Sequence, residues 1–352
     1  MTSFWGLSTA PKTTSFQSAL NRPIFRKKFI CEVGKEKKKR RERKREEGEG
    51  REIWLGGRLP DDHRLPSVAS TGHRTRWSER YWGGGAELVA PGDGDRCWCQ
   101  RAGGVLGRNN TAKDIFILAG QSNMAGRGGV NHGKWDGNIP PECKPKRSIL
   151  RFTANLDWEV AREPLHVDID IGKVCGVGPG MAFANEIIRS HRSRTGIIGL
   201  VPCAVGGTSI NKWGKGSRLY DQLVKRANEA LKDGGGTIRA ILWFQGESDT
   251  VNKDDAETYK GKMVMLIEDL RLDLNLPSLP FIQVVLASGE GTITNIEMVR
   301  KAQMGIKMKN VKCVDAKGLP LNADNLHLTT MSEVKLGLKL AYAFLLSFSH
   351  FH

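Results

Sequence analysis

Short hydrophobic runs alternate with longer stretches of mixed polarity from residue 111 to the end of the chain. The runs are bounded by Gly, Pro or Asp, which is typical of strands buried on both faces of a parallel sheet. The stretches between them repeat hydrophobic residues at helical spacing. The expected strands are Asp114–Ala119, Thr195–Ala204, Ile238–Phe244, Pro280–Ala287 and Val311–Ala316, and the expected helices are Met181–His191, Arg218–Lys232, Asp255–Leu272, Ile296–Lys307 and Ser332–Leu346.

This alternation predicts an α/β fold, a three-layer α/β/α sandwich with a mostly parallel five-stranded sheet. We assign residues 111–352 to this domain. Ligands of such open sheets bind at the carboxyl ends of the strands, so candidate chemistry is sought there.

Residues 1–110 have a different character. They show no sustained periodicity, and the charge run Lys35–Arg45 is followed by a Gly/Glu stretch. The chain carries a formal net charge of +16, and residues 1–110 hold 23 Lys+Arg against 13 Asp+Glu. This composition predicts a disordered basic extension, or a spurious one that a gene model adds. A solvated extension is favoured over an arm that binds nucleic acid.

Hydropathy and cysteine content bear on the compartment. The start of the chain lacks an apolar signal-peptide region, and no stretch approaches the roughly 18–20 apolar residues that span a bilayer. The seven cysteines cannot all pair and are too sparse for a disulfide scaffold. We therefore expect a cytoplasmic protein with no membrane partner.

A candidate nucleophile follows the first expected strand, in the turn Gly120-Gln121-Ser122-Asn123. A small hydroxyl residue on a strand-to-helix turn can project above the sheet, with its own N–H at the same place. The turn lacks the G-x-S-x-G pattern, and taken alone it is equally compatible with Ser122 as a helix N-cap.

The second and third expected strands end in candidate hydrogen-bond donors. Gly206-Gly207 allows a close approach of the backbone to a ligand, although paired glycines also form plain tight turns. Gln245 can offer a side-chain amide to a developing oxyanion.

Asp324 and His327 follow the fifth expected strand. Three residues apart on a turn, they can face the same way, so that Asp324 would hold the imidazole in its working tautomer. A histidine before a helix is otherwise a capping or surface residue. The presence of four such parts at four strand ends favours a hydrolase.

The blocks GQSNMAGRG, VPCAVGGTSI, WFQGESD and DNLHLT, in this order, resemble the four signature blocks of SGNH-type hydrolases. The resemblance is to the carbohydrate esterase family 6 and sialate O-acetylesterase-like branch, in particular its plant probable carbohydrate esterases, and covers Asp114 to Leu346. It implies Ser122 as nucleophile, Asp324 and His327 as the rest of the triad, and Ser122, Gly207 and Gln245 as oxyanion-hole donors, with Gly206 as the neighbouring alternative to Gly207.

The identity of the triad acid is open between Asp324 and Glu247, because relatives of this type have been assigned either position. The spacing favours Asp324, since a carboxylate three residues from His327 needs no long-range coincidence. Glu247 would then brace Gln245 or a backbone amide.

The expected reaction is acyl transfer to water, and it needs no metal or organic cofactor. The resemblance implies an acylated carbohydrate as substrate, with a small acyl group such as acetyl. Trp135 and Trp213 would stack on a sugar or serve as packing, and Arg127 would steer an acidic sugar or lie on a helix face. The alternatives are a catalytically weak carbohydrate-binding protein on this scaffold, and nucleic-acid binding through the basic arm.

Overall fold

The structure is a computed structural model, and it describes residues 112–190, 196–232 and 235–348. The predictions for residues 1–110 therefore lie outside the described residues, and they stay predictions.

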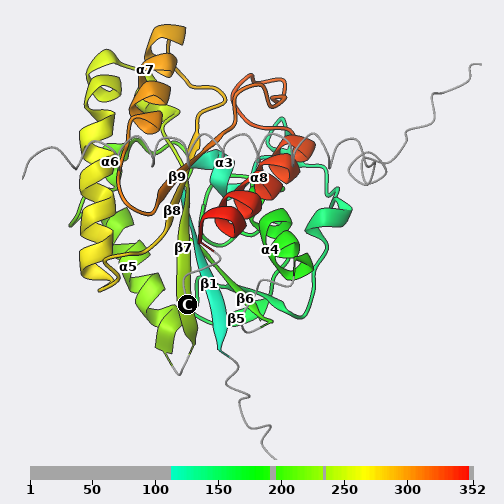
Figure 1. Ribbon diagram of the computed structural model, residues 1–352. Coiled ribbons are helices and arrows are strands. Elements are labelled where there is room, and N and C mark those ends of the chain that lie inside the picture. Colours follow the sequence, from blue (N-terminus) through cyan, green and yellow to red (C-terminus); the bar gives the residue numbers. More distant parts are fainter. Residues whose placement is uncertain (1–111, 191–195, 233–234, 349–352) are drawn as a thin grey trace, which may run out of the picture. The chain divides into compact units, whose positions relative to one another are not determined.

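A seven-stranded sheet in the order β5-β4-β6-β1-β7-β8-β9 forms the centre of the described part (Figure 1). All neighbouring strands run parallel except β4 and β5, which are antiparallel. The five predicted strands are confirmed as β1 (Lys113–Gly120), β6 (Ile198–Pro202), β7 (Gly236–Phe244), β8 (Phe281–Val285) and β9 (Val311–Asp315).

The prediction of five strands was wrong in number, because β4 (Ile149–Phe152) and β5 (Trp158–Val160) extend the sheet beyond β6. Both are short, and β5 forms one edge of the sheet. The buried Arg151 interrupts the hydrophobic run of β4 and pairs with Asp168. A charged residue inside a four-residue strand removes the signal that marks a buried strand.

Helices cover both faces of the sheet, as predicted. Figure 1 shows α4 (Pro179–Arg189) and α8 (Thr330–Phe348) on one face and α5 (Arg218–Leu231), α6 (Lys253–Asp273) and α7 (Ile293–Met304) on the other. The smaller elements are α3 (Ser122–Ala125), β2 (Val130–Asn131), β3 (Lys134–Trp135), η1 (Pro141–Cys143), η2 (Ile210–Lys212) and η4 (Ser248–Thr250).

Local sequence sets where these helices begin. The side chains of Ser217, Asn252 and Thr292 accept hydrogen bonds from backbone N–H groups three residues ahead, at the starts of α5, α6 and α7. Such caps satisfy donors that have no partner within the helix. In α4, Pro179 occupies the first position, where its missing N–H costs nothing.

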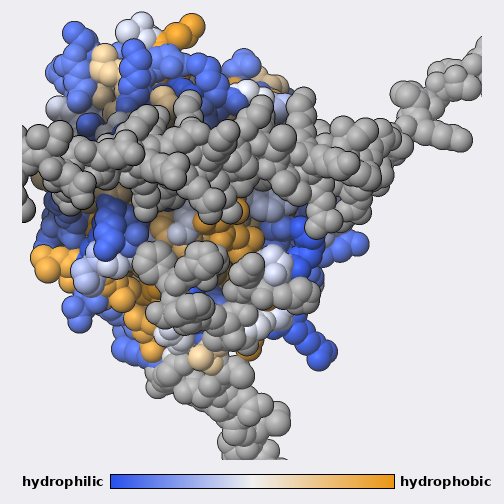
Figure 2. All heavy atoms as spheres, viewed as in Figure 1, coloured by the Kyte–Doolittle hydropathy of each residue, from blue (hydrophilic) through white to orange (hydrophobic). Residues whose placement is uncertain are grey.

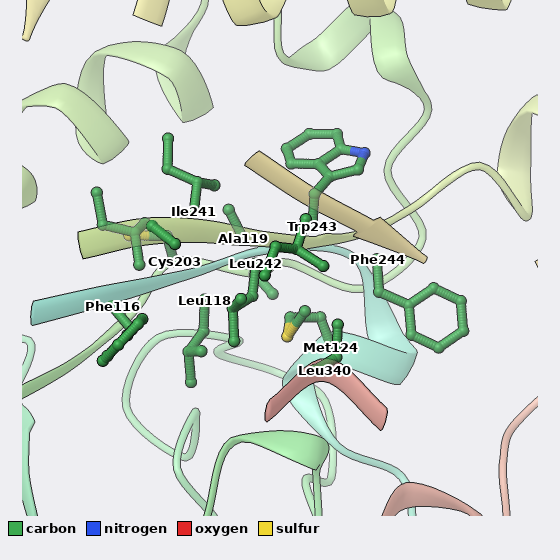
Figure 3. Packing of buried hydrophobic residues seen from close by; sticks show 14 of the residues in the cluster. Phe116, Leu118, Ala119, Met124, Cys203, Ile241, Leu242, Trp243, Phe244 and Leu340 are labelled. Carbon is green, nitrogen blue, oxygen red and sulfur yellow. The ribbon is translucent and has the colours of Figure 1, made fainter. Parts of the chain in front are cut away.

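The core lies on both sides of the sheet because strand side chains alternate in direction. Figure 3 shows Ile241 and Trp243 on one face of β7 and Leu242 and Phe244 toward the other, and all four are fully buried. On the α4 and α8 face, Phe116 meets two further rings edge-on, with centroids 4.8 Å from Phe183 and 5.0 Å from Phe344.

The outer surface is more polar than the core. Where described residues are visible in Figure 2, hydrophilic side chains are mixed with smaller groups of hydrophobic ones. Within the described ranges, no helix combines the length and hydropathy required to cross a membrane.

Candidate active site

Ser122 stands on a sharp turn between β1 and α3. Gly120 has a φ of +128°, and a Cβ there would lie 2.1 Å from the carbonyl oxygen of Phe244 in β7. Only glycine fits this turn, which places Ser122 at the carboxyl end of the sheet as the first residue of α3. The N-cap of α3 is Gln121, so the alternative of Ser122 as an N-cap is wrong.

The predicted triad residues come together in one hydrogen-bonded chain. Ser122 Oγ lies 2.9 Å from His327 Nε2, and His327 Nδ1 lies 2.7 Å from Asp324 Oδ2. The other oxygen of Asp324 accepts the backbone N–H groups of Leu326 and His327 at 3.0 and 2.9 Å. Burial opposes ionisation of Asp324, but these two N–H groups and the imidazole outweigh it and lower the pKa of the carboxyl. A hydroxyl, an imidazole and a carboxylate joined in this way can serve chemically as a nucleophile, a general base and an orienting acid.

Two backbone N–H groups, those of Ser122 and Gly207, have no acceptor among the described residues. The Ser122 N–H lies in the first turn of α3, where no helical carbonyl precedes it. Gly207 is exposed with a φ of +69°, and its N–H has no acceptor among the described residues. The neighbouring Gly206 N–H is different, since it donates to Asp170 Oδ1 at 3.0 Å. The geometry therefore favours Gly207 over Gly206 as a donor to an oxyanion.

Gln245 does not have the free amide that the sequence prediction requires. Its Nε2 donates to the carbonyl oxygen of Thr208 at 2.9 Å and to the carboxylate of Asp249, so both N–H hydrogens have acceptors. Its Oε1 accepts from the Tyr259 hydroxyl at 3.1 Å. Burial raises the pKa of Asp249 to about 6, and this enclosed carboxyl needs the donor that Gln245 provides. In this arrangement Gln245 holds the loop after β6 rather than an oxyanion.

Glu247 is fully buried, and Asn123 lies between it and the turn that carries His327. Its Oε1 accepts from Asn123 Nδ2 at 2.7 Å, and Asn123 Oδ1 accepts the backbone N–H of Leu328 at 2.9 Å. Burial raises the pKa of Glu247 to about 7, although the bond from Asn123 works in the opposite direction. Asn123 thus links the Glu247 turn to the residue directly after His327. Sequence reasoning missed Asn123, whose only signal was its place beside Ser122.

The environment of Arg127 differs from both sequence interpretations. Helix α3 ends at Ala125, so Arg127 does not lie on a helix face. Its side chain is buried in an ion pair with Asp170, which satisfies the charge that would steer an acidic sugar.

The two candidate stacking tryptophans also differ from each other. Trp213 is fully buried and packs edge-on against Trp243, with centroids 5.1 Å apart, which confirms its packing role. Trp135 in β3 is half-buried against the core.

The described ranges contain no group of three or more His, Cys, Asp or Glu placed to hold a metal ion. Their four cysteines are free thiols, with Cys143, Cys175 and Cys203 buried and Cys313 exposed.

Comparison with known proteins shows which family the chain belongs to. The model of the family "SASA: Carbohydrate esterase, sialic acid-specific acetylesterase" matches residues 112–346. The chain belongs to this family. It is 60% identical to the "Probable carbohydrate esterase At4g34215" of Arabidopsis thaliana over 240 residues, which cover 66% of this chain and 91% of that protein. The chain is accordingly a carboxylic ester hydrolase of the carbohydrate esterase type.

Solved structures match the same part of this esterase. The crystal structure of the Arabidopsis thaliana protein AT4G34215 has a TM-score of 0.65 and 58% identity, covering 67% of this chain and 99% of that one. NanS has a TM-score of 0.54 and 16% identity, covering 67% of this chain and 97% of its own. At that identity NanS supports the fold alone, and the SGNH-type fold expected from the sequence is confirmed.

Proposed function

We propose that this esterase removes small acyl groups, acetyl above all, from carbohydrate hydroxyls through Ser122, His327 and Asp324. The observation that carries the proposal is the continuous hydrogen-bonded chain from Ser122 Oγ through the imidazole to Asp324. A catalytically weak carbohydrate-binding protein on this scaffold would be expected to have a broken chain, so the intact one favours catalysis.

In the first half of the reaction, His327 Nε2 takes the proton of the Ser122 hydroxyl as Oγ attacks the ester carbonyl. The tetrahedral oxyanion is held by the N–H groups of Ser122 and Gly207. Each such donor is worth about 3–4 kcal/mol of transition-state stabilisation. The imidazolium then protonates the sugar oxygen as it leaves.

In the second half, water attacks the acyl group on Ser122 and gives a proton to the same imidazole. Asp324 keeps the Nδ1–H of His327 directed at its carboxylate, so that Nε2 stays free to accept. The short aliphatic acid leaves, and Ser122 regains its proton. The expectations of a cytoplasmic location and of no membrane or nucleic-acid partner stay predictions.

The test measures initial rates of 4-nitrophenyl acetate hydrolysis by the wild type and by Ser122→Ala. Loss of turnover with an unchanged circular dichroism spectrum is the expected result. Ser209→Ala is a matched control, because Ser209 lies in the nearby loop after β6 without a side-chain cap bond. A Ser122→Ala enzyme as fast as the wild type would exclude Ser122 as the nucleophile.

The substrate class needs a second assay, in which acetate release is measured from acetylated neutral sugars and from acetylated sialic acid. Release from at least one of them at a rate above that from a simple alkyl acetate is expected. Equal rates on sugar and alkyl esters would contradict a carbohydrate substrate.

A further inference from the structure

A buried ion pair lies against the glycine turn after β6. Arg127 and Asp170 are only 6% and 1% exposed, and Arg127 Nη2 bonds to Asp170 Oδ2. The second oxygen of Asp170 accepts the N–H of Gly206 at 3.0 Å. Arg127 Nη1 in turn donates to the carbonyl oxygen of Gly126 at 2.9 Å. The Asp170 carboxylate therefore binds Arg127, in the segment after Ser122, and Gly206, in the turn after β6.

Gly206 lies directly beside the nucleophile and is enclosed by the same pair. A Cβ on Gly206 would lie 2.7 Å from Arg127 Nη2, 3.1 Å from Asp170 Oδ2 and 3.5 Å from Ser122 Cβ. No side chain fits there without moving the ion pair. The ion pair therefore lies directly against this peptide, and the bond from the Gly206 N–H to Asp170 holds it there.

The residues on either side of Gly206 are held as well. The Val205 N–H donates to the carbonyl oxygen of Gly120 at 3.0 Å, and the Thr208 carbonyl accepts from Gln245 at 2.9 Å. The Gly206 N–H is taken up by Asp170. The next N–H in the chain, that of Gly207, has no acceptor within the described ranges. Bonds at Val205, Gly206 and Thr208 fix the turn on both sides of the Gly207 N–H, which in this described segment is the first unpaired donor after Gly206.

We propose that the buried Arg127–Asp170 pair is a positioning device for the oxyanion hole, which holds Gly206 so that the Gly207 N–H faces the developing oxyanion. The inference rests on the proposed function. The pair does not touch the reacting atoms and acts through the Gly206–Gly207 peptide. A buried ion pair suits this task when additional hydrogen bonds satisfy its remaining atoms, as Gly206 and Gly126 do.

The test compares two double variants, Arg127→Met/Asp170→Asn and Arg127→Met/Asp170→Leu. Both lack the ion pair and carry at position 170 a side chain branched at Cγ, but only asparagine keeps an oxygen that can accept the Gly206 N–H. The matched control uses the buried Arg151 and its partner Asp168, two residues before Asp170. Its variants are Arg151→Met/Asp168→Asn and Arg151→Met/Asp168→Leu, because no hydrogen bond joins this pair to the glycine turn among the described residues.

Two readouts are taken: kcat and KM for 4-nitrophenyl acetate, and the hydrogen-exchange rate of the Gly206 amide. Loss of a whole oxyanion donor costs about 10²–10³-fold in kcat. A misplaced donor should make kcat about 10–100-fold lower in the leucine member than in the asparagine member, with similar KM. Gly206 exchange should be faster in the leucine member, and the control pair should show neither difference.

Equal kcat in the two Asp170 members, or a kcat difference of the same size in the Asp168 members, would overturn the inference. A wild type without any ester hydrolysis would overturn the proposed function instead. In that case the exchange rates still decide whether Asp170 positions the turn, since equal Gly206 exchange in both members contradicts it.

Discussion

Two carboxylates act on the His327 turn, and they differ in exposure, hydrogen bonding and pKa. The side chain of Asp324 is 47% exposed, touches the imidazole directly and accepts two backbone N–H groups. Glu247 is fully buried, and Asn123 lies between it and the turn. The pKa of Asp324 is lowered, while burial raises that of Glu247 to about 7.

The difference separates the roles of the two acids. An orienting acid must stay ionised while the imidazole carries a positive charge, and Asp324 has the donors that keep it so. Burial disfavours the charged form of Glu247 and raises its pKa, and its Oε2 has no hydrogen-bond partner among the described residues. Its buried position suits the fixing of Asn123 better than the stabilisation of a charge.

The largest predicted effect is that of Asp324→Asn, compared with Glu247→Gln. An amide at position 324 can present its NH₂ to His327 and stabilise the wrong tautomer, and a similar change in a serine protease costs about 10⁴-fold in kcat. Glu247→Gln keeps an oxygen that can accept from Asn123. It should lower kcat about 10–100-fold, by analogy with residues that hydrogen-bond to the ligands of a metal ion. Both variants are assayed on one substrate from pH 5 to 9. A larger loss in Glu247→Gln would place the triad acid in the segment after β7.

Asn123→Ala should have an intermediate effect on activity. The substitution removes both the acceptor of the Leu328 N–H and the donor to Glu247. The turn that carries His327 is then no longer linked to the segment after β7. A loss of about 10–100-fold in kcat is expected. Asn185→Ala is the control, because Asn185 is also largely buried but bonds to carbonyl oxygens in and near α4. If Asn185→Ala lost activity while Asn123→Ala kept it, the proposed support of the His327 turn by Asn123 would be contradicted.

The two acids should also affect stability with opposite signs. Glu247 binds its proton more tightly in the folded state, so wild-type stability falls as pH rises from about 4.5 to about 7. The shift corresponds to about 3 kcal/mol at most. Glu247→Gln removes this loss, and its melting temperature should exceed that of the wild type at pH 8 but not at pH 4.5.

Asp324 has a lowered pKa, and its contribution to stability is present above the ordinary aspartate pKa and is lost only in acid. Asp324→Asn should therefore lower the melting temperature at both pH 6 and pH 8. A gain in stability at pH 8 for Asp324→Asn, or none for Glu247→Gln, would contradict the assignment of the two environments.

The smallest effect is expected from removal of residues 1–110. Their sequence lacks the hydrophobic periodicity that docking on the domain would need, so the melting temperature and the esterase rate should stay nearly unchanged. A fall of many degrees would show that this segment packs on the domain.

Much of this arrangement follows from local sequence. The five predicted strands have short hydrophobic runs, and Ser122, Gly207 and His327 each follow one of these strands, so their meeting at one edge of the sheet was predictable. Asp324 was predictable because it lies three residues from its partner.

The remaining features depend on contacts between distant segments. Asn123 and Glu247 are 124 residues apart, and Arg127 and Asp170 are 43 apart. No periodicity marks such pairs. Gln245 was assigned to the oxyanion because the sequence does not reveal that Asp249 and Thr208 take both of its N–H hydrogens.

The assignment of Asp324 as the orienting acid is tested most directly by the proton resonance of His327 Nδ1. A hydrogen bond of 2.7 Å to a carboxylate shifts such a proton far downfield. The proton spectrum of the wild type at acid pH should contain this signal, Glu247→Gln should retain it and Asp324→Asn should lose it. A downfield signal that survives in Asp324→Asn but disappears in Glu247→Gln would contradict the assignment.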